Sequence, residues 1–128
     1  HRILKLTTAG SFVKAWGVMG DGPGEFNEPW GVAVDQHGAV YVTDYLNHRI
    51  QKFTSTGQYL MEWGQKGSGP EQFNMPTGIA VDAQGNVYVA DLSKNEDLGE
   101  VIVECNNNQV YTIRPNKGSL NIKNVHQL

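Results

Sequence analysis

The distribution of apolar residues along the chain predicts a series of short β-strands joined by tight turns. Residues 31–35 and 40–43 are nearly continuous apolar runs, as is typical of buried strands, whereas residues 49–53 alternate apolar and polar side chains. A turn with glycine at its end, residues 54–57, then leads to another strand-like run at 58–63. The pattern therefore predicts four antiparallel strands in series.

This arrangement occurs twice in the chain. Residues 1–47 and 48–94 align without a gap, and 23 of the 47 aligned positions are identical. The identical pairs include Trp16 and Trp63, Asp35 and Asp82, and Asp44 and Asp91. A period of this length with four short strands in each unit is typical of the blades of a β-propeller. The predicted fold class is therefore all-β, built of four-stranded antiparallel blades.

The repeat divides the chain into incomplete and complete blades. We expect propeller blades over residues 1–113: a half blade at 1–16, a full blade at 31–63, and a second full blade at 78–113 with an insertion near 95–99. In that second blade, residues 101–105 and 109–113 are the expected third and fourth strands. Residues 114–128 repeat nothing earlier, and we interpret them as a C-terminal tail that either adds an edge strand or stays mobile.

Composition narrows the classes of partner. The 128 residues are 39% hydrophobic and 18% charged, which is typical of a folded domain, and the net charge is −3. A negative chain is a poor match for nucleic acid, because phosphate-binding faces are basic. Cys105 is the single cysteine, so no intrachain disulfide forms. No apolar run approaches the roughly 20 residues that cross a bilayer, so we expect no membrane partner. The compartment stays open.

The motif from Pro29 onward resembles an NHL repeat. It reads Pro29-x-Gly31-Val32-Ala33-Val34-Asp35, then Gly38, Val40-Tyr41-Val42, Asp44 and Asn47-His48-Arg49-Ile50. The resemblance is strong over residues 1–94 and weak over 95–113. It implies a β-propeller, usually of six blades, of which this chain spans about two and a half. The second unit departs from the motif at its end, where Asp91-Leu92-Ser93-Lys94 stands in place of Asp44-Tyr45-Leu46-Asn47.

Most of the recurring residues are interpreted as structural. Asp44 and Arg49 form the clearest charged pair, in which the carboxylate caps a turn and the arginine bridges neighbouring loops. Asp35 and its counterpart Asp82 precede a turn, and Asp91 repeats Asp44. Trp16 and Trp63 recur at the end of the fourth strand, where a large ring packs blade against blade.

The sequence contains no convincing catalytic or metal site. The histidines His1, His37, His48 and His126 are scattered, whereas zinc or catalytic sites need converging ligands. Some propellers related to NHL proteins are lyases or lactone hydrolases that hold a metal at the ring axis, but Trp30, Gly31, Thr77 and Gly78 occupy the start of the first strands here and offer no ligand. We therefore predict no cofactor and no catalytic residue.

Non-recurring aromatic residues are the best candidates for recognition. Trp30 is replaced by Thr77 in the second unit, and Tyr45 by Leu92, so blade packing does not require them. In a propeller, the loop that leads into the first strand of a blade and the loop between its second and third strands lie on the same rim. This predicts a binding patch of Trp30, Tyr45, Leu46, Asn47 and His48. The leading hypothesis is a non-catalytic binding or scaffold module for a protein or glycan.

Two alternatives stay open at this point. The chain could be a fragment of a propeller enzyme whose active site lies outside it. It could also be a structural unit that forms a homo-oligomer through exposed strand edges.

Overall fold

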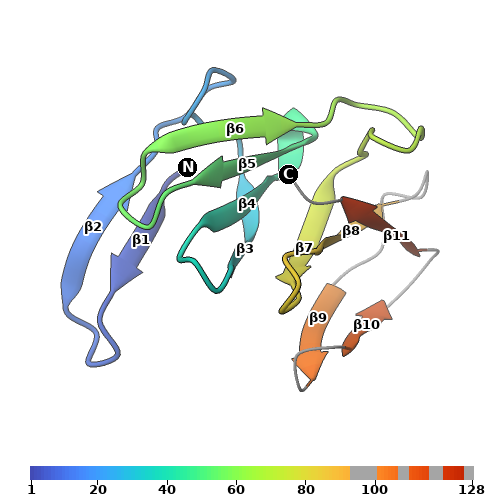
Figure 1. The fold of residues 1–128 in the computed structure, drawn as a ribbon. Helices are drawn as coiled ribbons and strands as arrows, with labels where there is room; N and C mark the ends of the chain where they lie inside the picture. The colour runs from blue at the N-terminus through green and yellow to red at the C-terminus, as the bar shows by residue number, and fades with distance from the viewer. Residues whose placement is uncertain (93–100, 107–109, 116–119, 126–128) are drawn as a thin grey trace.

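The fold is all-β, as predicted. The computed structural model describes residues 1–92, 101–106, 110–115 and 120–125, with side chains for residues 1–91. The elements are β1 (Ile3–Leu6), β2 (Phe12–Trp16), β3 (Pro29–Val34), β4 (Val40–Asp44), the short 3₁₀ helix η1 (Tyr45–Asn47), β5 (Arg49–Phe53), β6 (Tyr59–Trp63), β7 (Pro76–Val81), β8 (Val87–Leu92), β9 (Val101–Asn106), β10 (Val110–Pro115) and β11 (Leu120–Val125). Figure 1 shows the strands grouped into separate small sheets.

One complete blade occupies the middle of the chain. Strands β3, β4, β5 and β6 form a four-stranded antiparallel sheet in sequential order. Asp35 shapes the turn between β3 and β4, because its Oδ1 accepts hydrogen bonds from the backbone N–H groups of His37 and Ala39, each at 2.9 Å. Asp82 makes the same turn before β8. The two aspartates are therefore turn formers, as the spacing predicts.

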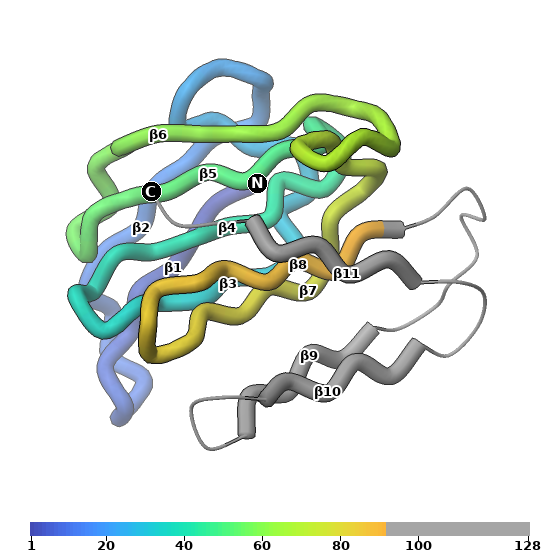
Figure 2. Tube along the Cα trace, turned by 45° about the vertical axis from the view of Figure 1, so that its right-hand side comes forward, coloured from blue at the N-terminus to red at the C-terminus, as the bar shows by residue number. Residues whose placement is uncertain are grey.

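Shorter sheets flank this blade. Strands β1 and β2 form a two-stranded sheet before it, and β7 pairs with β8 after it. Figures 1 and 2 show β7 running beside β3, and the two strands are in contact. The half blade, the full blade and the next pair of strands therefore follow one another in the expected order.

The third strand beside β8 differs from the expected one. Residues 101–105 were expected there, but among the described strands β9 pairs with β10 alone, and β11 pairs with β8 over its whole length. The outer edge of β8 needs hydrogen-bond partners, and the six-residue strand in the tail provides a full antiparallel ladder for it. The insertion near 95–99 lies outside the described residues.

Two apolar clusters hold the described residues together. One contains Phe26, Val40, Val42 and Phe53, with Ile3 and Trp16 packed against it. The other lies between the full blade and β7–β8 and contains Tyr41, Ile50, Phe73, Ile79, Val87 and Val89, with Trp63 at its margin. The first cluster therefore joins the half blade to the full blade, and the second joins the full blade to β7–β8.

Candidate functional site

Three of the predicted binding residues lie on the rim formed by β3 and η1. The ring of Trp30 stacks on that of Tyr45, with a centroid separation of 5.0 Å and an interplanar angle of 30°. Trp30 is 50% exposed, and Leu46 is also exposed. These three residues, Trp30, Tyr45 and Leu46, are called the rim patch below.

The rim patch is fixed by backbone contacts between two segments distant in sequence. The N–H of Tyr45 donates to the carbonyl oxygen of Glu28 at 3.3 Å, and the N–H of Leu46 donates to that of Asn27 at 3.1 Å. The segment before β3 and the η1 turn therefore lie side by side, which is the loop arrangement that the propeller interpretation required. Glu28 adopts a left-handed conformation at φ 56° to make this approach.

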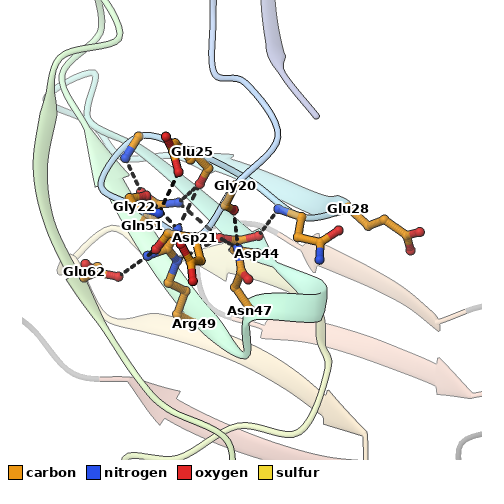
Figure 3. A network of polar contacts seen from close by, with 12 residues as sticks. Gly20, Asp21, Gly22, Glu25, Glu28, Asp44, Asn47, Arg49, Gln51 and Glu62 are labelled. Carbon is orange, nitrogen blue, oxygen red and sulfur yellow. Dashed lines mark hydrogen bonds and ion pairs between the residues drawn. The ribbon is translucent and has the colours of Figure 1, made fainter.

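Beneath the rim, Arg49 organises a buried polar network (Figure 3). Its Nε donates to Asp44 Oδ2 at 2.8 Å, and Nη1 donates to Glu62 Oε2 at 2.7 Å. The remaining donors reach backbone carbonyl oxygens at 2.8–2.9 Å, those of Asp21, Gly22 and Glu25. A guanidinium group has five N–H donors, so every one is used. Arg49 thus ties the loop before β3 to the end of β4 and to β6.

Electrostatics keep this arginine charged. Burial disfavours the charged form, but hydrogen bonds and charge attraction from Asp44 and then Glu62 outweigh it and raise the pKa of Arg49 above its ordinary value. The Arg49 side chain is 7% exposed and that of Asp44 is fully buried. A charge-assisted contact of this kind in a dry site is strong only with well-aligned partners, which the network provides.

Asp44 is the second centre of the network. Its Oδ1 accepts from the N–H of Asn27 at 2.8 Å, and its Oδ2 accepts from Asn47 Nδ2 at 2.9 Å and Gln51 Nε2 at 3.2 Å as well as from Arg49. Asn47 Nδ2 also donates to the carbonyl oxygen of Gly20 at 2.8 Å. Asn47, predicted as a binding residue, therefore has both amide hydrogens engaged inside the protein.

His48 is likewise engaged. Its Nδ1 accepts a hydrogen bond from the N–H of Met75 at 3.0 Å. Burial lowers the pKa of the His48 imidazole, Lys66 adds to this, and Asp91 and Asp44 oppose it. A neutral ring keeps Nδ1 free to accept. His1, the aligned residue, makes the same contact with the N–H of Glu28 at 3.1 Å, so the interaction belongs to the repeat.

The remaining motif residues pack the blades. Trp16 contacts Phe53 with a ring-centroid separation of 5.8 Å, and Trp63 meets Tyr41 edge to face at 6.1 Å. Asp91 accepts from the N–H of Asn74, as Asp44 accepts from Asn27. The loop that follows β8, residues 93–100, lies outside the described residues.

Sequence reasoning missed Gln51 and Glu62 as members of the network. Gln51 is fully buried, with Oε1 accepting from the N–H of Gly24 at 2.8 Å and Nε2 donating to the carbonyl oxygen of Glu25 at 2.6 Å. The available signal was a long polar residue next to Ile50 in a strand inside the four-stranded sheet. Polar groups buried in strands need partners, which directs attention to the nearest loop.

The described residues hold neither a metal-binding cluster nor a membrane-spanning helix. Among the side chains that the structure describes, those of residues 1–91, no three His, Cys, Asp or Glu lie close enough to hold a metal ion. Within the same residues, no helix has the length and apolar character to cross a bilayer. The expected lack of a cofactor and of a membrane partner stays a prediction.

Comparison with known proteins identifies the repeat. The family model described as the NHL repeat matches residues 26–53 and 73–96. A comparison with curated proteins found no match. The two matched segments begin at Phe26 and Phe73, which are aligned and fully buried, so each match starts at the loop that leads into a blade.

Proposed function

Residues 26–53 and 73–96 are NHL repeats, and on that basis we propose that this propeller-type chain is a non-catalytic binding module that presents the rim patch to a protein partner. The observation that carries the proposal is the Trp30–Tyr45 stack beside exposed Leu46. Large aromatic side chains that are exposed yet held rigid are typical centres of protein interfaces.

The rigidity of the scaffold supports recognition. Tyr45 and Leu46 belong to η1, directly after Asp44, so the network around Asp44 and Arg49 fixes the turn that carries them. A preorganised surface loses little conformational entropy on binding, which raises affinity. The proposed partner therefore meets a surface that is already in its binding conformation.

The chemistry around the rim patch favours a protein over a glycan. A sugar-binding site combines an aromatic ring with polar groups that satisfy the sugar hydroxyls. Here Asp44 and both hydrogens of the Asn47 amide are engaged inside the protein, and His48 Nδ1 is occupied by Met75. The exposed residues nearest in sequence to Trp30 on β3 are aliphatic, Val32 and Val34. An apolar protein segment matches this surface better.

The partners of the charged residues also support a non-catalytic role. The charged residues of the network, Asp44, Arg49 and Glu62, are joined to one another, and Asp35 and Asp82 hold turns. A catalytic acid or base needs an ionisable group that reaches a substrate. The best-placed carboxylates of this chain serve the scaffold instead.

The test uses peptides selected on the full chain from a random display library. We expect peptides rich in aromatic and aliphatic residues that lose about 30-fold or more in affinity with Trp30→Ala, the size of a hot-spot residue. Leu60→Ala is the matched control, because Leu60 is as exposed as Trp30 but lies on β6, and it should change affinity less than about 2-fold.

An oligosaccharide panel, read by tryptophan fluorescence, forms the second arm of the test. Sugars that bind through Trp30 while no peptide does would overturn the choice of a protein partner. Selected peptides that bind equally well to Trp30→Ala would overturn the rim patch as the binding surface.

A further inference from the structure

A histidine hydrogen bond crosses the joint between the full blade and the next unit. His48, which ends η1, accepts at Nδ1 from the N–H of Met75 at 3.0 Å. Met75 is the last residue before β7, at the end of the loop 64–75 that leads there from β6. This contact therefore ties the end of the loop to the rim of the full blade.

Both ends of this hydrogen bond have an unusual backbone conformation. His48 has φ 53° and Met75 has φ 55°, in the left-handed region where the Cβ of most residues is crowded. Glu28, which aligns with Met75, has φ 56° and also donates to a histidine Nδ1, that of His1. The conformation and the contact thus recur together. The hydrogen bond offsets a backbone strain that favours opening once the bond is lost.

Only the neutral imidazole can make this contact. In a neutral ring one nitrogen accepts, whereas in the charged ring both nitrogens donate. A proton on His48 Nδ1 would point at the N–H of Met75, so protonation and the hydrogen bond exclude one another. Histidine is the side chain whose charge ordinarily changes between about pH 5 and 8. The contact is therefore sensitive to pH in that range.

The charged groups around His48 come from three elements. Burial lowers the pKa of His48, Lys66 in the loop 64–75 adds to this, and Asp91 on β8 and Asp44 on β4 oppose it without cancelling it. Both carboxylates already accept hydrogen bonds inside the protein. Histidine in the unfolded chain titrates near 6.5, so the stability that comes from neutral His48 is complete above about pH 6.5 and is lost as the pH falls below it.

The other contacts across the joint do not titrate in this range. Thr43 Oγ1 donates to the carbonyl oxygen of Thr77 at 2.6 Å, and Phe73 and Ile79 are buried in the cluster that joins the full blade to β7–β8. None of these groups gains or loses a proton between about pH 5 and 8. Protonation of His48 therefore opens the rim end of the joint and leaves its apolar core packed.

We propose that the hydrogen bond between His48 and Met75 is an acid-sensitive latch, which releases the end of the loop 64–75 from η1 when His48 is protonated. The N–H of His48 donates to the carbonyl oxygen of Tyr45 at 3.4 Å, so the same histidine closes the turn that carries Tyr45 and Leu46. Acidic pH therefore also loosens the rim patch. This consequence rests on the proposed function, whereas the latch itself does not.

The test is hydrogen exchange of the Met75 amide in the full chain, measured by NMR as a protection factor relative to an unstructured chain at each pH. We expect the protection of Met75 to fall about 10-fold or more between about pH 7.5 and 5, because a freed amide exchanges by local opening. The circular dichroism spectrum should stay the same over this range, since the core of the joint stays packed.

Three variants isolate the imidazole. His48→Asn places an acceptor that does not titrate, Oδ1, on Cγ, where histidine has Nδ1, and asparagine tolerates the left-handed conformation; the protection of Met75 should then change less than about 2-fold with pH. His48→Leu offers no acceptor, so Met75 should exchange fast at both pH values. His37→Asn, at an exposed position in a turn, is the matched control and should behave like the wild type.

Two results would overturn the latch: protection of Met75 that is the same at both pH values in the wild type, or an equal fall in His48→Asn. For the rim patch, peptides selected on the chain should bind the wild type about 5-fold or more weakly at the lower pH and bind His48→Asn equally at both. Unchanged peptide affinity with an open latch would refute the coupling to the rim patch. A lack of any peptide binding would refute the proposed function alone, because the exchange of Met75 needs no ligand.

Discussion

Replacing Arg49 with lysine tests whether the buried network holds the rim in place. Lysine keeps the charge but has three N–H donors in place of the planar set of five, so at least two of the five hydrogen bonds are lost. A hydrogen bond that involves a charged group contributes about 1.5–3 kcal/mol. Glu62 is partly exposed and regains water, which reduces the loss.

We therefore expect Arg49→Lys to lower the free energy of unfolding by about 2–4 kcal/mol. The assay is urea denaturation followed by circular dichroism at a concentration where the chain is monomeric. Arg2→Lys is the matched control: Arg2 is the aligned residue but is exposed, and a surface substitution of this kind changes stability by about 0.5 kcal/mol or less.

A double-mutant cycle locates the effect. Asp44→Asn removes the carboxylate that Arg49 Nε contacts, so the two substitutions should be non-additive by about 1 kcal/mol or more. If Arg49→Lys destabilised the protein no more than Arg2→Lys does, the network would not be what fixes the loop, and the reasoning would be refuted.

Two further predictions concern packing and pH. Gly64→Ala should lower the free energy of unfolding by about 1–3 kcal/mol more than Gly85→Ala in the same denaturation assay. Both glycines have positive φ, but only a Cβ at Gly64 collides with the Phe73 ring. Equal losses for the two variants would contradict the packing argument. Burial, with the hydrogen bond to Asp35, raises the pKa of Tyr41 to about 12. Because tyrosine in the unfolded chain titrates near 10, the stability that comes from keeping Tyr41 protonated is complete below about pH 10, and about 2–3 kcal/mol of it is lost towards pH 12. Tyr41→Phe should remove that part of the pH dependence, measured by denaturation from pH 9 to 12.

Local pattern predicted the strands well. The alternation and the turn glycines placed β3 to β6 within two residues of their bounds, because hydrophobic period and turn chemistry are local properties. The roles of Asp35 and Asp82 also followed from local spacing, since each caps a turn that begins at its own position. The Asp44–Arg49 pair was predicted as structural, and its geometry agrees with that interpretation.

The rest depended on contacts between distant residues. The sequence grouped Asn47 and His48 with Trp30, but only the fold shows the Asn47 amide donating to Gly20 and His48 accepting from Met75. The partner of the β8 edge could not be predicted either, because a strand edge accepts any strand that reaches it and β11 is far away along the chain.

By itself, the sequence determined the all-β class, the repeat and the rim on which the loops gather, because these follow from periodicity and alignment. Tertiary structure decided which rim residues remain exposed and which of two aligned surfaces is covered: Val32 and Ile79 have nearly the same side chain, but only Ile79 packs against a neighbouring blade. Whether a residue is buried depends on what packs against it, so identical local patterns can lie in different environments.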